Sequence, residues 1–283
     1  MPDPLAARRP RWSVRRQVVV FLLLTVVLSW WAWPLTLLNP TSTALVPIGP
    51  SIAAVVVTAL SGGRRAVAAL LRQLVRWRVH PGWYAAALLG PPVLIGAVVL
   101  ANRALGAAVE PSATFPGWHL LPLLFAIRIV VGGPLGEELG WRGFLLPLLM
   151  QRHGALVASL LVAPLWFAFH LPAMLSGPAT AQRPVLSFLL WVVMASVLHT
   201  WLWLRTEHSV LVVMLFHGAI DTSAALLLPQ FTGADYTRAW WLLVAFTTAA
   251  AALVVLRDHR FRRLRDVDHA GAGSRTSLAG ATG

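Results

Sequence analysis

Eight stretches of this sequence are mostly apolar over about the 20 residues that an α-helix needs to cross the hydrocarbon core of a bilayer. In that environment a spanning helix satisfies all of its own backbone hydrogen bonds. We therefore predict an all-α membrane protein, a polytopic bundle of about eight transmembrane helices. The second stretch is the shortest and contains Pro47 and Pro50. The stretches cover approximately residues 18–38, 45–60, 82–100, 119–136, 155–175, 185–204, 210–228 and 240–256.

The composition agrees with a membrane protein and excludes several other classes. Of the 283 residues, 58% are hydrophobic and 12% are charged, and the mean hydropathy of +0.71 is far above that of soluble domains. The net charge of +13 comes from arginines in short clusters between apolar runs, as in signals that orient membrane insertion, so we exclude a nucleic-acid partner. The absence of cysteine excludes disulfides, thiolate metal ligands and a cysteine nucleophile.

The distribution of arginine predicts the orientation of the bundle. Arginines concentrate before the first stretch, between the second and third, and after the fourth, sixth and eighth. The opposite loops contain only Arg103, Arg183 and Arg238. With eight spans, the positive-inside rule predicts that both termini lie in the cytoplasm. The lack of lysine and the short cytoplasmic loops favour a bacterial plasma membrane as the location.

Two segments outside the spans have compositions of their own. The basic segment 62–81 places Arg65, Arg72 and Arg76 on one helical face and Leu70 and Leu71 on another. This pattern fits either a helix lying in the headgroup region or a solvated loop that carries an orientation signal. The tail 266–283 is rich in small and polar residues, so we predict that it is disordered.

Ionisable side chains are rare in the predicted spans, where they are costly, usually face the bundle interior and mark functional sites by default. We interpret His199 in the sixth span and Arg128 in the fourth as structural. The remaining groups occur at the end of the fourth span, in the motif "GPLGEELGWRGFLLP", and in the fifth and seventh spans. They are the candidate site residues: Glu137, Glu138, Arg142, His170, His217 and Asp221.

Helical spacing divides these groups into pairs. Glu138 and Arg142 are four residues apart and share a helix face, which favours an ion pair, whether structural or functional. Glu137 is rotated by about 100° from Glu138 and points elsewhere, toward a cavity where it could act as a base. His217 and Asp221 are also four residues apart. If Glu137, His170 and His217 meet at one depth, they could hold a water molecule, a metal ion or both.

Three motifs in this order resemble those of the CAAX protease and bacteriocin-processing family of intramembrane endopeptidases. "EELGWR" has the form E-E-x-x-x-R, "WFAFH" ends in the expected histidine but begins with Trp166 instead of phenylalanine, and "HGAID" corresponds to H-x-x-x-N. The resemblance implies a catalytic core over residues 116–228. On this basis, we divide the remainder into N-terminal helices over 1–115, a last helix with a basic end over 229–265, and the tail.

The resemblance also implies roles for the site residues. Glu137 would activate water for attack on a peptide bond with the help of His170. Glu138 and Arg142 would orient and polarise the site, and His217 with residue 221 would stabilise the oxyanion. We favour a mechanism without a cofactor. The substrate would be a peptide or a segment of a membrane protein at the lipid bilayer, and prenylated proteins are not expected in a bacterium.

Position 221 departs from the family pattern, because Asp221 replaces asparagine and an ionised carboxylate cannot donate a hydrogen bond. Asp221 could be protonated, it could orient and charge His217, or it could bind a metal. In the metal alternative, one divalent ion, with zinc favoured, would be held by Glu137, His170, His217 and Asp221. The departure also leaves open a non-catalytic relative that binds membrane peptides. A proton- or ion-coupled transporter is the third alternative, although we find no inverted repeat.

Overall fold

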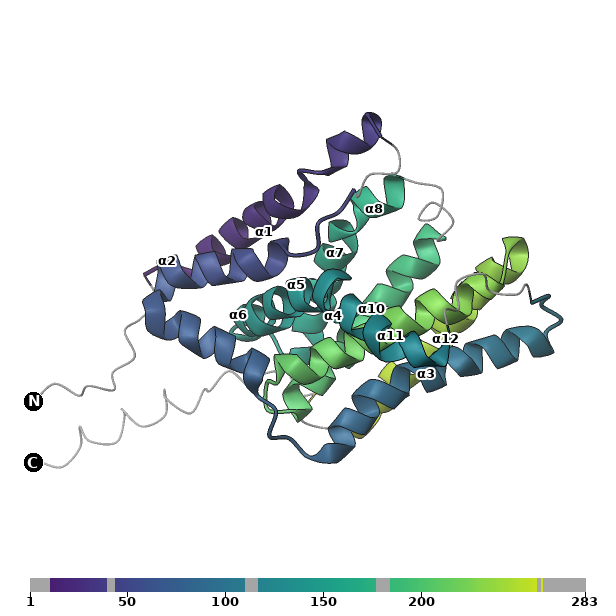
Figure 1. Cartoon of the computed structure of the whole chain (residues 1–283). Coiled ribbons are helices and arrows are strands. Elements are labelled where there is room, and N and C mark those ends of the chain that lie inside the picture. Colours follow the sequence, from purple (N-terminus) through teal and green to yellow (C-terminus); the bar gives the residue numbers. More distant parts are fainter. Residues whose placement is uncertain (1–10, 40–43, 110–116, 177–183, 259–260, 262–283) are drawn as a thin grey trace, which may run out of the picture.

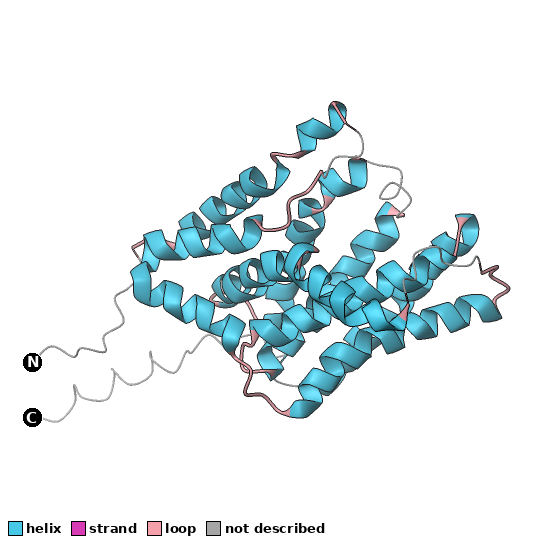
Figure 2. Cartoon of the chain, viewed as in Figure 1, coloured by secondary structure: helices cyan, strands magenta, loops and turns pink. Residues whose placement is uncertain are grey.

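The computed structural model describes residues 11–39, 44–109, 117–176, 184–258 and 261. These residues form helices, turns and loops without any strand, which confirms the all-α prediction (Figures 1 and 2). Among the described residues, six helices are long and apolar enough to cross a membrane. They correspond to the first, second, third, sixth, seventh and eighth predicted spans. Their cores are α1 (Val14–Trp30), α2 (Gly49–Arg72), α3 (Pro81–Ala104), α10 (Val185–Arg205), α11 (Val210–Leu227) and α12 (Gly233–Arg257).

The second span is a complete helix despite its prolines. Helix α2 begins at Gly49, so Pro50 occupies the first turn, where its missing N–H costs no helical hydrogen bond. The helix kinks at Gly63, whose φ of +71° is a conformation that glycine adopts without strain. Beyond the kink it continues to Arg72, and a 3₁₀ turn follows over Gln73–Val75. The basic segment is thus helical in its first half; its position in the headgroup region remains a prediction.

The fourth predicted span is broken into short helices. Helix α4 (Leu121–Val131) ends at two glycines, and Gly133 has a φ of +136°. Helix α5 (Pro134–Glu138), a π-helix (Leu139–Leu145) and α6 (Leu146–Met150) follow in direct succession. The break lets α5 leave the line of α4. Because a π-helix often occurs at a functional site, its position beside Glu138 is informative.

The fifth predicted span is also broken, and His170 lies at the break. Helix α7 covers Ala155–Phe169, and α8 covers Leu171–Leu175. Pro172 stands in the first turn of α8, where a proline fits the start of a new helix. The His170 side chain therefore projects from a helix junction. The neighbouring residue, Phe169, is held by α1, because the Phe169 carbonyl accepts a hydrogen bond from Trp30 Nε1 at 3.1 Å.

The helix pair α5 and the π-helix is enclosed by the other elements. Every residue from Gly136 to Phe144 is buried. Helix α2 and the residues just before it pack so closely against this segment that a Cβ on Gly136 would lie 2.4 Å from the carbonyl oxygen of Pro47. A Cβ on Gly140 would lie 2.5 Å from the Pro50 carbonyl carbon. The two glycines therefore place the acidic motif in the centre of the bundle. The tail 266–283 lies outside the described residues.

Candidate active site

The carboxylate of Glu138 is the point on which the charged groups of the site converge. Its Oε1 accepts a hydrogen bond from Arg142 Nη1 at 3.0 Å and one from His217 Nδ1 at 2.7 Å. The Nε2 of His199 lies 4.0 Å from the same oxygen. Glu138, Arg142 and His199 are each 0% exposed. Since a buried carboxylate requires compensation, Glu138 holds both Arg142 and the ring of His217 in place.

Arg142 also lies against an aromatic ring. Its guanidinium carbon is 4.0 Å from the centroid of the Trp166 ring, a distance typical of a cation–π contact. Arg142 thus connects the π-helix to α7 through Trp166 and to α11 through Glu138 and His217. Among the described residues, its Nε and Nη2 have no hydrogen-bond partner. The same is true of Glu138 Oε2.

Glu137 points away from this cluster, as its 100° rotation from Glu138 predicts. Its Oε2 accepts a hydrogen bond of 2.6 Å from Trp166 Nε1, and its Oε1 lies 4.0 Å from His170 Nε2. The other ring nitrogen of His170, Nδ1, is 2.7 Å from the Trp166 carbonyl oxygen and donates to it. Residues 166 and 170 therefore act together: the backbone of Trp166 orients His170, and its indole orients Glu137.

Gly133 separates Glu137 from His217. A Cβ at this position would lie 2.6 Å from Glu137 Oε1 and 4.0 Å from His217 Cε1. Only a residue without a side chain leaves this space open, and the φ of +136° at Gly133 also favours glycine. The break after α4 thus places the backbone of Gly133, without a side chain, between Glu137 and His217.

His217 lies between two carboxylates. Its Nδ1 bonds to Glu138, and its Nε2 lies 3.5 Å from Asp221 Oδ2. The Asp221 side chain is 28% exposed and that of His170 is 19% exposed, whereas Glu138 is fully enclosed. The site therefore has a closed side at Glu138 and an open side at His170 and Asp221. Among the residues that the structure describes, His170 and Asp221 are thus the partly exposed side chains of the site.

The structure brings the six predicted residues into one region, arranged as two neighbouring groups. Glu137 and His170 form the first; Glu138, Arg142, His217 and Asp221 form the second. Sequence reasoning gave no role to Trp166 and interpreted His199 as structural. His199 Nδ1 does bond to the Ala195 carbonyl at 2.7 Å, as expected of a core histidine, but its other nitrogen faces Glu138. The sequence signal that could have identified His199 is that histidines are rare in the predicted spans.

A metal ion fits this arrangement poorly. Among the described residues, one set of donor atoms lies within 4.8 Å, from Glu138, His199 and His217. However, the Glu138 oxygen in this set already accepts from a guanidinium and an imidazole, and a dication there would stand against the positive charge of Arg142. The four ligands considered from the sequence lie as two pairs, Glu137 with His170 and His217 with Asp221.

Comparison with known proteins places this geometry in context. The family model described as "Type II CAAX prenyl endopeptidase Rce1-like" matches residues 118–223, which include all of the site residues above. Residues 118–223 are thus similar to the CAAX protease family. The chain is 26% identical over 152 residues to CAAX prenyl protease 2 of Methanococcus maripaludis. That match covers 51% of this chain and 53% of the relative, so the chain spans about half the length of the curated relative it matches.

Proposed function

We propose that this chain is a member of the CAAX protease family and an intramembrane endopeptidase in which Glu137 activates water. The arrangement of Glu137 and His170 carries the proposal. Glu137 Oε1 and His170 Nε2 are 4.0 Å apart, so one water molecule can lie within hydrogen-bond distance of both. The Trp166 indole occupies the other carboxylate oxygen and leaves Oε1 as the one that faces the water.

The reaction that this geometry supports is peptide hydrolysis by general base catalysis. Glu137 takes a proton from the water while the water oxygen attacks the carbonyl carbon of the peptide bond. The carbonyl oxygen becomes an oxyanion. The C–N bond then breaks as the protonated Glu137 passes its proton to the leaving nitrogen. The products are a new carboxylic acid and a new amine, which ionise to a carboxylate and an ammonium group by transfer of one proton, and Glu137 returns to its ionised form.

His217 is the best-placed donor to the oxyanion. Its Nδ1 is held by Glu138, and a second carboxylate, Asp221, lies beside its Nε2. An imidazolium satisfies both carboxylates, because it carries a proton on each nitrogen. Of the three roles considered for Asp221, this arrangement favours orienting and charging His217. In this proposal the single Nε2 proton, which faces Asp221 on the open side of the site, is shared between Asp221 and the oxyanion when the oxyanion forms there.

Glu138 and Arg142 support the reaction without contacting the substrate. Both are fully enclosed, so they cannot reach a peptide on the open side. Their role in this proposal is to hold His217 and Trp166, and through these the oxyanion donor and the base. No step requires a metal ion, and the position of Arg142 on Glu138 supports a metal-free mechanism.

The class of substrate follows from the position of the open side. His170 and Asp221 border it: Asp221 belongs to α11, one of the helices long and apolar enough to cross a membrane, and His170 follows the shorter apolar helix α7. A peptide or an unwound segment of a membrane protein would reach the site there. We propose such a substrate for a protein of the bacterial plasma membrane.

Hydrolysis in isotopically labelled water tests the proposal. The purified chain in nanodiscs would be incubated with membrane proteins in H₂¹⁸O, and new C-termini would be identified by mass spectrometry. We expect ¹⁸O in the carboxylate of each new C-terminus, absence of these termini with Glu137→Gln, and unchanged cleavage with 1,10-phenanthroline. Cleavage that persists in Glu137→Gln would contradict the role of Glu137, and cleavage lost with the chelator alone would contradict the metal-free mechanism.

A further inference from the structure

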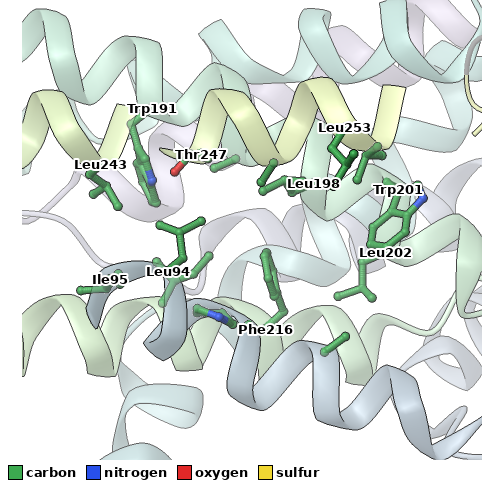
Figure 3. A pocket seen from close by; sticks show the side chains of 17 residues that line it. Leu94, Ile95, Trp191, Leu198, Trp201, Leu202, Phe216, Leu243, Thr247 and Leu253 are labelled. Atoms are coloured by element: carbon green, nitrogen blue, oxygen red, sulfur yellow. The ribbon is translucent and has the colours of Figure 1, made fainter. Parts of the chain in front are cut away.

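A long apolar cavity lies between α3, α10, α11 and α12 (Figure 3). Its volume is about 260 Å³. Seventeen residues line it, and Thr247 is the only one of them with a hydroxyl group; none is charged. Apolar cavities of this kind do not hold water and readily accept apolar ligands. The lining therefore selects for hydrocarbon.

The shape of the cavity fits an extended chain. On α10 its lining runs from Trp191 to Leu202, and on α12 it runs from Leu243 to Val254. Eleven residues of helix correspond to about 16 Å. Figure 3 shows Trp191 and Leu243 at one end of the cavity and Leu202 at the other. The cavity is thus a slot about three helical turns long.

The slot opens toward the surroundings of the bundle. Ala86 and Gly90 of α3 line it and are exposed, as is Leu253 of α12. On the same flank of α3, Leu89 is 61% exposed and Val93 is 70% exposed. In a membrane-spanning bundle, an exterior this apolar faces the acyl chains of lipids. The small side chains at the mouth leave a lateral entrance from the bilayer.

One end of the slot lies beside a group of charges. Trp201, in the lining, donates from Nε1 to Asp258 Oδ2 at 3.1 Å, and Arg205 Nε donates to the same oxygen at 2.7 Å. The Arg205 side chain is 38% exposed, and Arg257 is exposed beside Asp258. Arginines are strong phosphate binders, and a phospholipid carries its phosphate at the end of its hydrocarbon chains.

From this lining, length, entrance and charged end, we propose that the slot binds one acyl chain of a glycerophospholipid, with the headgroup phosphate at Arg205 and Arg257. The chain would pack directly behind the candidate site. Ala195 lines the slot and its carbonyl holds His199 Nδ1, while the ring of Phe216, also in the lining, is 4.9 Å from the His199 ring. A bound lipid therefore fills the space that supports His199.

Photo-crosslinking with a phospholipid tests the proposal without any measurement of proteolysis. The probe is a phosphatidylglycerol with a diazirine near the end of one acyl chain, incorporated into nanodiscs with the purified full chain. Because the headgroup is placed at Arg205, we expect crosslinks at the opposite end of the slot, on Trp191 and Leu243. Crosslinks spread evenly over the exposed faces of the bundle would overturn the proposal.

Two glycines of α3 provide a matched pair of variants. A Cβ on Gly90 or on Gly96 would meet no atom within 4 Å, so both positions accept a side chain, but only Gly90 lines the slot. We expect Gly90→Leu to reduce the crosslinks in the slot by about fivefold or more, since its side chain obstructs the mouth. Gly96→Leu should leave them unchanged. Equal crosslinking in the two variants would overturn the proposal.

A second pair of variants, on α12, tests the opposite side of the entrance. It also provides an independent test if a variant of the first pair does not fold. Ala250 lines the slot, whereas Ala252 is exposed and does not. Ala250→Phe should reduce crosslinking and Ala252→Phe should not, with thermal unfolding compared for both. Excess unlabelled phospholipid should compete with the probe. If only a free fatty acid or an alkylated peptide competes, the slot does not bind a phospholipid.

Discussion

The indole of Trp166 donates a 2.6 Å hydrogen bond to one oxygen of Glu137, and its ring lies 4.0 Å from the guanidinium carbon of Arg142. One side chain thus contacts both groups of the site. The motif at this position normally begins with phenylalanine, which has no N–H group. In this chain the carboxylate of the proposed base is therefore held by a donor that the usual motif lacks.

Replacing Trp166 with phenylalanine keeps an aromatic ring and removes the donor. Hydrogen bonds to charged groups contribute about 1.5–3 kcal/mol, so we expect Trp166→Phe to lower kcat by about 10- to 100-fold. KM should change little, because the indole is buried away from the open side. Trp191→Phe, in the apolar slot, is the control and should keep its kcat. An unchanged kcat in Trp166→Phe would show that the hydrogen bond does not position Glu137.

Separating Glu138 from Arg142 should destabilise the bundle. Both side chains are 0% exposed. Removing the charge of Glu138 leaves Arg142 as an unpaired buried charge, and removing Arg142 leaves the Glu138 carboxylate with His217 as its remaining hydrogen-bond donor. We expect Arg142→Met and Glu138→Gln each to reduce the free energy of unfolding by about 3–5 kcal/mol. The double variant should lose less than the sum, because it contains no unpaired charge. Additive losses, measured by thermal unfolding in one detergent, would mean that the two residues do not act as a pair.

Variants of Asp221 distinguish its possible roles. Asparagine can donate a hydrogen bond directly to an oxyanion, so we expect Asp221→Asn to retain activity within about tenfold of the wild type. Asp221→Leu can neither charge His217 nor donate, and its kcat should fall by about 100-fold or more. If Asp221→Asn is as inactive as Asp221→Leu, the carboxylate itself is indispensable, either to charge His217 or to bind a metal ion, and the effect of 1,10-phenanthroline on the wild type separates these two roles.

Asp258 gives a pH dependence of stability outside the membrane-spanning helices. Burial alone would raise the pKa of Asp258, but the Arg205 guanidinium beside it lowers this pKa below its usual value of 3.8. A carboxyl group whose pKa is lower in the folded than in the unfolded state stabilises the folded protein at pH values above the unfolded pKa. This stabilisation is lost as the pH falls through the folded pKa. We expect Asp258→Asn to lower Tm by about 1–3 °C at pH 6 and by less at pH 3. A Tm difference between Asp258→Asn and the wild type that increases as the pH falls would contradict the lowered pKa of Asp258.

The local features of the site could be predicted from the sequence. The contacts between Glu138 and Arg142 and between His217 and Asp221 follow from a spacing of four residues along a helical segment. The different directions of Glu137 and Glu138 follow from the rotation of about 100° per residue. The apolar stretches located the six long helices, because hydrophobicity over 20 residues reports directly on the bilayer.

The long-range features could not be predicted in the same way. His199 reaches Glu138 from a helix about 60 residues away, and nothing in the local sequence of α10 distinguishes it from a core histidine. The breaks at Gly133 and His170 depend on backbone geometry that an apolar window does not detect. The hydrogen bond of Trp166 depends on how α7 packs against α5, and packing is set by the whole bundle.

The central claim is that Glu137 makes this chain a protease, and a comparison of peptide termini in membranes tests it most directly. Cells that lack the endogenous gene would produce the wild type, Glu137→Gln, or Glu207→Gln as a control in an exposed turn, at matched levels. We predict new termini, identified by mass spectrometry, with the wild type and with Glu207→Gln but not with Glu137→Gln. Identical termini in all three, while deletion of the gene still changes the cell, would contradict proteolysis and favour peptide binding or transport.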